Sequence, residues 1–339
     1  MEKILTIVVP SYNAEKFLRD SLDSFWIETV LPDIEVLIVD DGSTDKTSEI
    51  AEEYVRNCPD SYRLITKENG GHGSGINCGI KHATGVYFKV VDADDWVEPE
   101  AFCCLVEALK RQEADIVYSG FLWAYDEGQE KKEQFTTKAE TAMPFEGVVY
   151  GKIYEFDQIA PSLYIKMHNM TIRTDILRQY GIHIDEHCFY VDTEYITYPV
   201  PYVRTICFVD GYVYMYRIGR QGQSVGIGKM QQYEKNYNKV MSSLLDFYGK
   251  LGEEIPCTAA KKKYIAGIIA RVVAGKIKIM LSFPGNNQKK MELRMFDENL
   301  RMHYPDIYHG NINKAVSVLR KSRYLMYYPV SAMVRKRYR

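Results

Sequence analysis

Three carboxylates crowd the end of an apolar, strand-like run in the sequence YFKVVDADD, where Asp92, Asp94 and Asp95 fall within four positions. Carboxylates this close repel one another unless water, a cation or a hydrogen-bond donor compensates their charge. In an open α/β sheet, ligands bind beyond the carboxyl ends of the strands. Two interpretations follow: the carboxylates form a cation or ligand site, or they cap the helix that begins near Pro99. Of the three, Asp95 is the better candidate for a cap.

A further pair of carboxylates, Asp192 and Glu194, lies at an expected helix start in the sequence HCFYVDTEYITYPV. A carboxylate can accept the proton that a hydroxyl group loses when it attacks a carbon atom. The alternative for Asp192 is an N-terminal helix cap. The nearby sequence HIDEHC, residues 183–188, contains metal-ligating residue types. No second ligand group with zinc-like spacing accompanies it, so we expect it to pack as a loop.

The elements that must position these residues alternate between strands and helices. We expect strands at residues 4–9, 35–39, 62–66, 86–91 and 115–119. We expect helices at 14–26, after the turn and N-cap at 43–45 through Val55, before His82 and at 99–111. This alternation predicts an α/β fold with a mostly parallel, Rossmann-like sheet and helices on both faces. Further on, we expect a polar loop at 125–152, helices over 162–180 and from Val191, β structure over 205–216, and a helical C-terminal region from about residue 229.

The composition limits the classes of function. The chain has 339 residues, of which 46% are hydrophobic, and a formal net charge of −2, which argues against general nucleic-acid binding. Its seven cysteines form no CxxC pair, so we expect reduced thiols. The first residues enter a strand directly without a signal peptide, and charged residues interrupt the most apolar stretch, 264–283. We therefore expect a cytoplasmic protein.

The C-terminal tail is basic, because no Asp or Glu follows Asp306. Aromatic and apolar residues alternate with Lys and Arg over 307–339, and Pro329 would bend any helix there. One interpretation is a solvated or core-docked terminal helix. The other is a peripheral anchor, in which the cations bind anionic lipid at the inner face of the cell membrane.

Four segments occur in a characteristic order: TIVVPSYN, LIVDDGSTD, ENGGHGSGIN and VVDADD. Together they resemble the nucleotide-sugar-binding domain of family 2 glycosyltransferases, which have the A-type glycosyltransferase fold. The resemblance is strong over residues 3–120, looser over 160–225, and fades beyond 230. A dinucleotide-binding fold is disfavoured, because its glycine-rich turn after the first strand is replaced here by PSYNAE.

The resemblance assigns roles around the nucleotide. Pro10 and Tyr12 form a flat edge for a nucleobase, and Asp41 accepts from the imide N–H of uracil, although an Asx turn is the alternative for Asp41. Asn69 begins a glycine loop whose amides approach the ligand, and its alternative is a simple tight turn. Asn77 is also expected to bind the nucleotide sugar.

The resemblance also assigns the chemistry. Asp92 contacts ribose or metal, and Asp94 binds Mn²⁺ or Mg²⁺, which bridges the two phosphates of the leaving group. Asp192 is the catalytic base for the acceptor hydroxyl. Arg217 pairs with the diphosphate, unless it is a sheet-edge residue in a surface ion pair. The remaining expected ligands, in a loop that closes over the diphosphate, are Gln221 and Ser224.

Three positions depart from the family pattern. Val191 replaces a Glu, Gly75-Ile76-Asn77 replaces Ala-Arg-Asn, and His168-Asn169-Met170 replaces Trp-Asn-Lys. They put acceptor geometry and sugar specificity in doubt. They also keep open a catalytically silent protein that binds a nucleotide sugar or a glycan.

The resemblance, together with the single expected base, therefore implies a metal-dependent, inverting glycosyltransferase with a UDP-type donor. Its acceptor would be a hydroxyl of a glycan or a lipid-linked glycan in cell-surface polysaccharide synthesis. We expect a catalytic domain at 1–225, with a nucleotide-sugar half at 1–120 and an acceptor half at 150–225, followed by a helical region at 226–339. The sugar, the linkage and the oligomeric state are left open.

Overall fold

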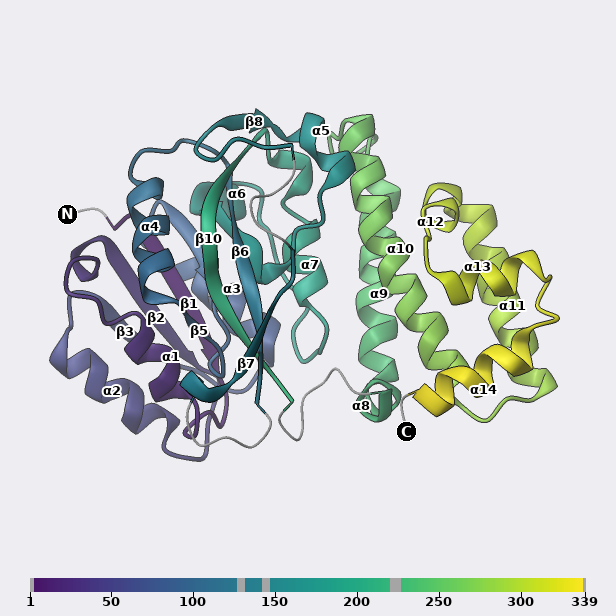
Figure 1. Ribbon diagram of the computed structural model, residues 1–339, viewed down its shortest axis with the longest axis horizontal. Helices are drawn as coiled ribbons and strands as arrows, with labels where there is room; N and C mark the ends of the chain where they lie inside the picture. The colour runs from purple at the N-terminus through teal and green to yellow at the C-terminus, as the bar shows by residue number, and fades with distance from the viewer. Residues whose placement is uncertain (1–2, 127–131, 142–146, 220–226, 338–339) are drawn as a thin grey trace. The chain divides into compact units, whose positions relative to one another are not determined.

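The computed structural model describes residues 3–126, 132–141, 147–219 and 227–337. The chain divides into two compact units, Met1–Gly222 and Gln223–Arg339. The first unit contains the sheet and the second is helical (Figure 1).

The first unit is built on one mixed sheet with the strand order β3-β2-β1-β4-β9-β6-β10-β5. Its parallel half consists of β1 (Leu5–Ser11), β2 (Ile34–Asp40), β3 (Tyr62–Thr66) and β4 (Tyr87–Val90). The other half consists of β9 (Met170–Arg173), β6 (Ile116–Tyr125), β10 (Thr205–Ile218) and β5 (Trp96–Val97). At the margins, β7 (Thr136–Ala139) pairs with β6, and β8 (Ile153–Glu155) pairs with β10. The expected α/β fold is confirmed, with a mixed sheet: the β3-β2-β1-β4 half is parallel, whereas β5, β7, β8 and β9 pair antiparallel with their neighbours.

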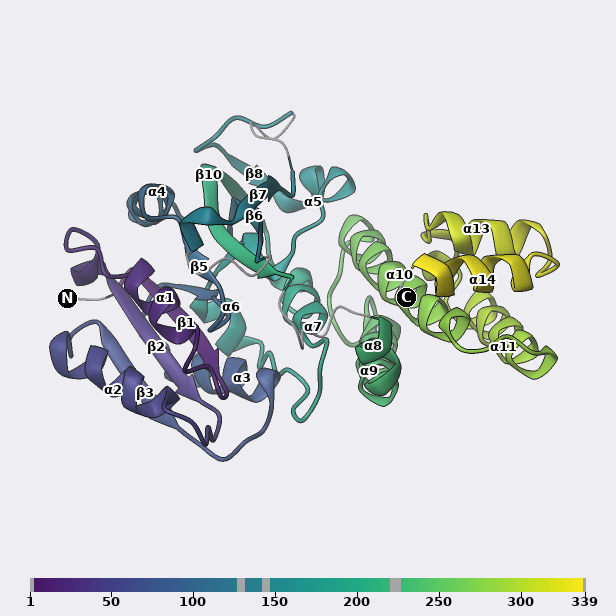
Figure 2. The same cartoon turned by 60° about the horizontal axis from the view of Figure 1, so that its bottom comes forward.

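Helices cover both faces of the parallel half (Figure 2). Alternate residues of β1 (Leu5, Ile7 and Val9) share one core with residues of α1 (Leu18–Ser24), α2 (Thr47–Asn57) and α4 (Pro99–Leu109). Val8 faces α3 (His72–His82), where a Cβ atom on Gly79 would lie 2.5 Å from the Val8 side chain. The missing Cβ thus lets α3 pack closely against β1.

The segment 162–180 is the main error of the sequence prediction, which expected a helix. It forms β9 in the middle of the sheet, antiparallel to both β4 and β6, and then the short helix α6 (Thr174–Gln179). Met170, Thr171 and Ile172 are all buried, because neighbouring strands and both faces enclose them. A buried run of four residues shows no alternation that would distinguish a strand from a helix. Two short helices complete the unit, α5 (Phe156–Ile159) and α7 (Asp192–Thr197).

Over the residues that the structure describes, the second unit is built from helices, as expected. It contains α8 (Ile227–Gln232), α9 (Glu234–Lys250), α10 (Ala259–Ser282), α11 (Asn287–His303), α12 (Pro305–His309), α13 (Lys314–Lys321) and α14 (Tyr327–Arg337). The longest helix, α10, is central and contacts α8, α9, α11, α12 and α14. Within the described ranges, no helix combines the length and the apolar character needed to cross a bilayer.

The basic tail is partly docked in this unit. Val316, Leu319, Tyr327 and Val330 are buried, whereas Leu325 is 77% exposed. The described part of the tail is thus core-docked on one side, as the first interpretation allowed, and exposed on the other.

Candidate active site

Six of the residues predicted from the sequence line one cavity of about 550 Å³ at the carboxyl ends of β1, β2 and β4. They come together because parallel neighbouring strands end at the same edge of a sheet. These residues are Pro10, Tyr12, Asp41, Asn69, Asp92 and Asp94. The same cavity is lined by His72, from the start of α3, which the sequence predicted to lie beside the ligand. It is also lined by residues 187–189, which the sequence did not assign to the nucleotide.

Asp41 is the anchor of the glycine-rich loop. Its carboxylate accepts hydrogen bonds from the backbone N–H groups of Gly70 (2.9 Å) and Gly71 (2.7 Å), and it forms an ion pair with Lys67 (2.6 Å). The Asn69 side chain donates to the backbone carbonyl of Asp41. The loop amides that were expected to approach a ligand therefore donate to Asp41 instead.

The Asx turn that was the alternative for Asp41 is formed by Asp40. Asp40, not Asp41, accepts the backbone N–H of Ser43 at 2.9 Å and the hydroxyl of Ser48. Two adjacent aspartates thus have different roles: Asp40 stabilises the turn before α2, and Asp41 faces the cavity and the glycine loop.

Asp92 and His72 form the electrostatic centre of the cavity, with His72 Nε2 at 2.8 Å from the Asp92 carboxylate. Burial by itself would lower the pKa of His72, but the charge and hydrogen bond of Asp92, helped by Asp192 and Asp94, raise it above its ordinary value. This pairing favours the protonated form of the imidazole beside the carboxylates.

The expected base, Asp192, is the first residue of α7 and has an exposed side chain. The protein packed around its carboxyl group raises the pKa of Asp192. His72 lowers this pKa, and the negative charge of Asp92 raises it further. Asp192 is therefore close enough to His72 and Asp92 to interact electrostatically with both. The N-cap of α7 is Val191, so Asp192 is not the cap that the alternative interpretation required.

Asp95 is not a helix cap, and the sequence prediction was wrong here. It is fully buried and accepts hydrogen bonds from the Tyr214 hydroxyl (2.5 Å) and the Arg217 backbone N–H (2.8 Å). Burial, followed by the charges of Asp94 and Asp92, raises its pKa well above the ordinary value. The cap of α4 is Glu98, whose carboxylate accepts from the Ala101 N–H at 2.7 Å.

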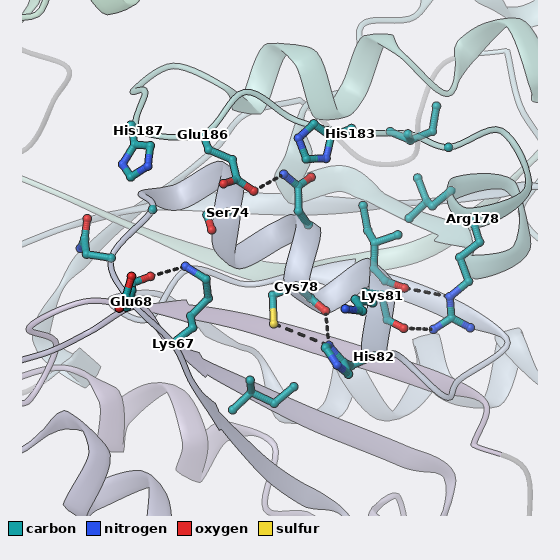
Figure 3. Close-up of a pocket in the computed structure, with 18 residues that line it drawn as sticks. Lys67, Glu68, Ser74, Cys78, Lys81, His82, Arg178, His183, Glu186 and His187 are labelled. Atoms are coloured by element: carbon teal, nitrogen blue, oxygen red, sulfur yellow. Dashed lines mark hydrogen bonds between the residues drawn. The ribbon is translucent and has the colours of Figure 1, made fainter.

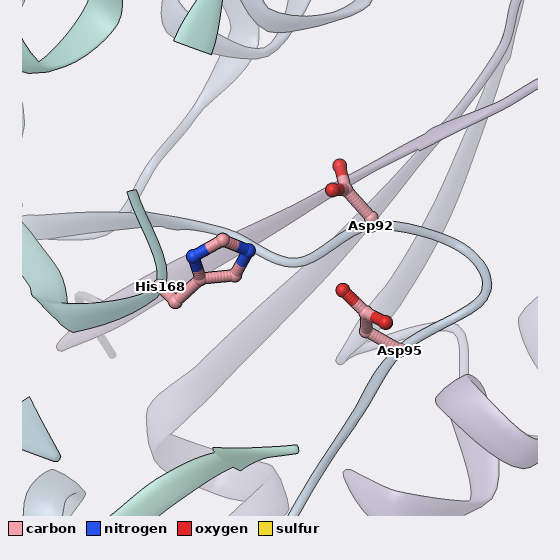
Figure 4. Close-up of side chains that lie close together, drawn as sticks. All are labelled: Asp92, Asp95 and His168. Carbon is pink, nitrogen blue, oxygen red and sulfur yellow. The ribbon is translucent and has the colours of Figure 1, made fainter. Parts of the chain in front are cut away.

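A group suited to a divalent cation combines Asp92 and Asp95 with His168, whose possible ligand atoms lie within 4.8 Å of one another (Figure 4). Burial lowers the pKa of His168 to about 3, so the imidazole stays neutral, as metal binding requires. Its Nδ1 atom is buried without a hydrogen-bond partner among the described residues. Carboxylate oxygens and a neutral imidazole fit a cation such as Mn²⁺.

This geometry differs from the sequence prediction in one respect. The expected pair was Asp92 and Asp94, and both line the cavity, but the three-residue group contains Asp95 and His168 in place of Asp94. The sequence pointed to His168 only as a departure from the family pattern. The HIDEHC segment takes no part in the three-residue group.

Arg217 lies outside the set of residues that line the cavity. It is only 4% exposed, so it is not a surface residue either. Its guanidinium forms an ion pair with Asp20 at 2.7 Å and donates to the backbone carbonyl of Asp94 at 2.9 Å. Arg217 thus supports the loop that carries the carboxylates, and its predicted contact with the diphosphate stays a prediction. Gln221 and Ser224 lie outside the described residues.

Asn77 lines a second groove. Figure 3 shows this groove, with Ser74 and Cys78 of α3 on one side and His183, Glu186 and His187 on the other. Its side-chain amide donates to the Ile184 carbonyl at 2.8 Å, and its oxygen accepts the Ile184 N–H at 2.9 Å. It also contacts the Glu186 carboxylate at 3.1 Å. Asn69 lines both this groove and the cavity described above, whereas Asn77 lines the groove alone. The hydrogen bonds of Asn77 hold the 183–188 loop on α3.

The family model described as Glycosyl transferase family 2 matches residues 6–181, more than half of the chain. The chain belongs to this family. Among curated relatives, the uncharacterized glycosyltransferase EpsJ of Bacillus subtilis is 41% identical over 121 residues, which is 36% of this chain and 35% of EpsJ. The hyaluronan synthase of Pasteurella multocida is 38% identical over 117 residues, 34% of this chain and 12% of that protein. The matches thus span about a third of EpsJ and much less of the synthase.

Solved structures confirm the A-type glycosyltransferase fold. TarS 1–349 of S. aureus in complex with UDP has a TM-score of 0.63 and 15% identity, with 98% of this chain and 91% of that chain covered. The mannosyltransferase PcManGT of Pyrobaculum calidifontis, solved with GDP-Man and Mn²⁺, has a TM-score of 0.51 and 15% identity, with 99% and 87% covered. At these identities the likeness concerns the fold alone. Membership of the family makes the chain a glycosyltransferase.

Proposed function

We propose that this glycosyltransferase moves a sugar from a UDP-type donor to a hydroxyl of a glycan or lipid-linked glycan in cell-surface polysaccharide synthesis, with inversion at the anomeric carbon. The observation that carries the proposal is the single cavity in which Asp41, Asp92 and Asp94 meet Pro10 and Tyr12. A nucleoside diphosphate needs both a flat base site and carboxylates for a charge-neutralising cation, and this cavity offers both.

The donor nucleotide would bind with its base against Pro10 and Tyr12. Each carboxylate oxygen has two lone pairs, so Asp41 can accept an imide N–H while it holds the glycine loop. The TarS complexes with UDP and UDP-GlcNAc and the PcManGT complex with GDP-Man support a nucleotide sugar as the ligand. UDP is our choice among these nucleotides, because uracil offers the imide donor that Asp41 would accept.

Asp92 and Asp94 would hold the cation, with His168 and Asp95 beside them. When bound, Mn²⁺ or Mg²⁺ supplies charge neutralisation for the departing diphosphate. His72 orients the Asp92 carboxylate through its 2.8 Å hydrogen bond. Arg217 stabilises the loop behind Asp94 from the buried side.

Asp192 would take the proton of the acceptor hydroxyl. Its raised pKa makes it a stronger base than an ordinary aspartate and brings that pKa closer to neutral pH. The oxygen of the acceptor then attacks the anomeric carbon as the bond to the diphosphate breaks. One base and one displacement give one inversion.

The acceptor and the location belong to the same proposal. We assign the first unit to catalysis, with its nucleotide half before residue 120, and the helical unit to a supporting role. The exposed side of the basic tail would bind anionic lipid at the inner face of the membrane, where a lipid-linked acceptor would lie.

The base assignment is tested with Asp192→Asn. The variant should keep its UDP affinity, measured by calorimetry, but lose sugar transfer by roughly 10²–10⁴-fold, the usual contribution of a positioned general base. Asp210→Asn, which removes an exposed aspartate on β10, is the matched control and should transfer at the wild-type rate. Unchanged transfer by Asp192→Asn would refute the role, and a wild-type protein that binds UDP without any transfer would favour the silent alternative.

A further inference from the structure

A second cavity, of about 340 Å³, lies within the helical unit, among α11, α12, α13 and the turn after α13. Its size is within the range of about 300–1,000 Å³ that is common for small-molecule sites. Six charged residues line it: Arg294, Asp297, Glu298, Arg301, Arg320 and Arg323. Four arginines therefore face two carboxylates in one small cavity.

The carboxylates already have their own arginines. Asp297 is 2% exposed and forms an ion pair with Arg320 at 2.7 Å, with a second bond from Arg320 Nε at 3.0 Å. The Tyr324 hydroxyl also donates to Asp297, and the Arg320 guanidinium stacks on the Tyr308 ring at 3.6 Å. This buried, hydrogen-bonded group forms a rigid base for the cavity.

The second carboxylate is also paired, since Glu298 contacts Arg294 at 2.9 Å. Of the four arginines, Arg301 and Arg323 are not paired with either carboxylate. In the part of the chain that the structure describes, neither guanidinium has a hydrogen bond or an ion pair. The cavity therefore has an excess of two positive charges on two arginines.

The backbone at the turn is also unusual. Arg323 and Tyr324 have φ angles of 49° and 65°, in the left-handed region that residues other than glycine rarely adopt. Tyr324 is held there by its bond to Asp297 and by burial of its ring. The conformation of Arg323 is thus fixed by a neighbour whose side chain belongs to the buried base of the cavity.

We propose that this cavity binds a phosphate group through Arg301 and Arg323, with the Arg320–Asp297 pair as its rigid support. The planar guanidinium presents several donors in a geometry that matches phosphate oxygens. The phosphate group could belong to a phospholipid headgroup or to a phosphate ester in solution, and the same two arginines would bind either one. The site belongs to the helical unit alone and does not depend on the proposed transfer reaction.

The test compares two double variants of the full chain that remove equal charge. Arg301→Ala/Arg323→Ala removes the two unpaired arginines of the cavity. Lys250→Ala/Lys263→Ala removes two exposed lysines of α9 and α10 that lie outside both the cavity and the basic tail. The probes are inorganic phosphate, glycerol 3-phosphate, and vesicles of phosphatidylcholine with and without phosphatidylglycerol, with calorimetry for the soluble probes and co-sedimentation for the vesicles.

We expect the arginine variant to lose at least tenfold in affinity and the lysine variant less than twofold. If this difference between the two variants is seen for the soluble probes and the protein does not bind vesicles, the ligand is a soluble phosphate ester. If the difference is seen for the vesicles, the ligand is a lipid headgroup. Equal losses in both variants, or no binding of any probe by the wild-type protein, would overturn the proposal. UDP binding, measured on the same proteins, should be unchanged, so failure here is distinguishable from failure of the proposed function.

Discussion

The aspartates of VVDADD have separate functions although they are nearly adjacent. Asp92 and Asp94 line the cavity, whereas Asp95 is buried behind it and receives two hydrogen bonds from β10. Spacing alone does not distinguish these roles, because the chain turns sharply after β4. The difference is set by burial and by the donors that each carboxylate meets.

Asp95→Asn should therefore affect stability more than Asp94→Asn does. The amide group would point its NH₂ at one of the two donors, Tyr214 or Arg217, and leave that donor unsatisfied, at a cost of about 1–3 kcal/mol. Urea unfolding measures this cost. Asp94→Asn is the control and should unfold near the wild-type midpoint while it loses cation-dependent donor cleavage. Equal stability of Asp95→Asn and the wild type would contradict the structural role of Asp95.

Glu194 predicts a pH dependence of stability. Burial raises its pKa from 4.5 to about 7, and one carboxylate oxygen has no partner within the described structure. The folded state thus binds more protons than the unfolded state between these values, and the free energy of unfolding should fall as pH rises from about 4.5 to about 7, by on the order of 2–3 kcal/mol.

Glu194→Gln should remove most of this fall, because the amide cannot ionise and its oxygen can still accept the Asp185 N–H. The measurement is the unfolding free energy at pH 5 and at pH 8 for both proteins. If the free energy of unfolding falls between pH 5 and pH 8 by the same amount in the variant and in the wild type, Glu194 is not the cause of the fall.

At the scale of elements, the cavity depends on how α3 meets the 183–188 loop. Gly73 of α3 touches the backbone of this loop, and a Cβ atom there would lie 2.2 Å from the Asp185 carbonyl oxygen. The loop is held on the same helix by Asn77 and contributes His187 to the cavity wall. The packing of this interface should therefore affect nucleotide binding.

Gly73→Ala should displace the loop, reduce UDP affinity several-fold and cost about 1–3 kcal/mol of stability, as overpacking against backbone usually does. Gly267→Ala in α10 is the matched control, since no atom lies within 4 Å of a Cβ there. The control should be neutral or slightly stabilising because alanine favours helix. Wild-type UDP affinity in Gly73→Ala would show that the loop position does not matter.

The elements also show what the sequence could and could not predict. The strands β1 to β4 are local runs that end in polar residues, so their positions along the chain followed from the pattern, and the family resemblance assigned Asp41 and Asp92 to one site. The pairing of β9 with β4 and β6 did not, because it depends on partners far away in the chain. The bond between Asn77 and Ile184 spans 107 residues, and His168 approaches Asp92 only through the position of β9. Such contacts have no local signal.

At the scale of the molecule, the tail needs a different test from simple truncation. Removal of residues 307–339 would take Ile307, Leu319 and Tyr327 out of the core of the helical unit. The exposed side can be changed without this damage, because Leu325 is 77% exposed and Met333 is 69% exposed.

Leu325→Ser/Met333→Ser should weaken binding to anionic vesicles by at least tenfold, because each buried apolar side chain contributes about 1.5–3 kcal/mol. Co-sedimentation at low salt measures this binding. Met291→Ser/Met295→Ser changes two exposed residues of α11 and should have little effect. Equal losses in the two variants, or no vesicle binding by the unchanged protein, would rule out the tail as the anchor.

The central claim is that this chain cleaves a UDP-linked sugar in the cavity formed by Asp41, Asp92 and Asp94. The direct measurement is UDP release from a panel of UDP-, GDP- and dTDP-sugars, with Mn²⁺, with Mg²⁺ and with a chelator. We predict UDP release from at least one UDP-sugar, stimulated by a divalent cation and lost in Asp92→Asn. Release that is equal in Asp92→Asn, or no binding and no cleavage of any UDP-sugar in the panel, would contradict the claim.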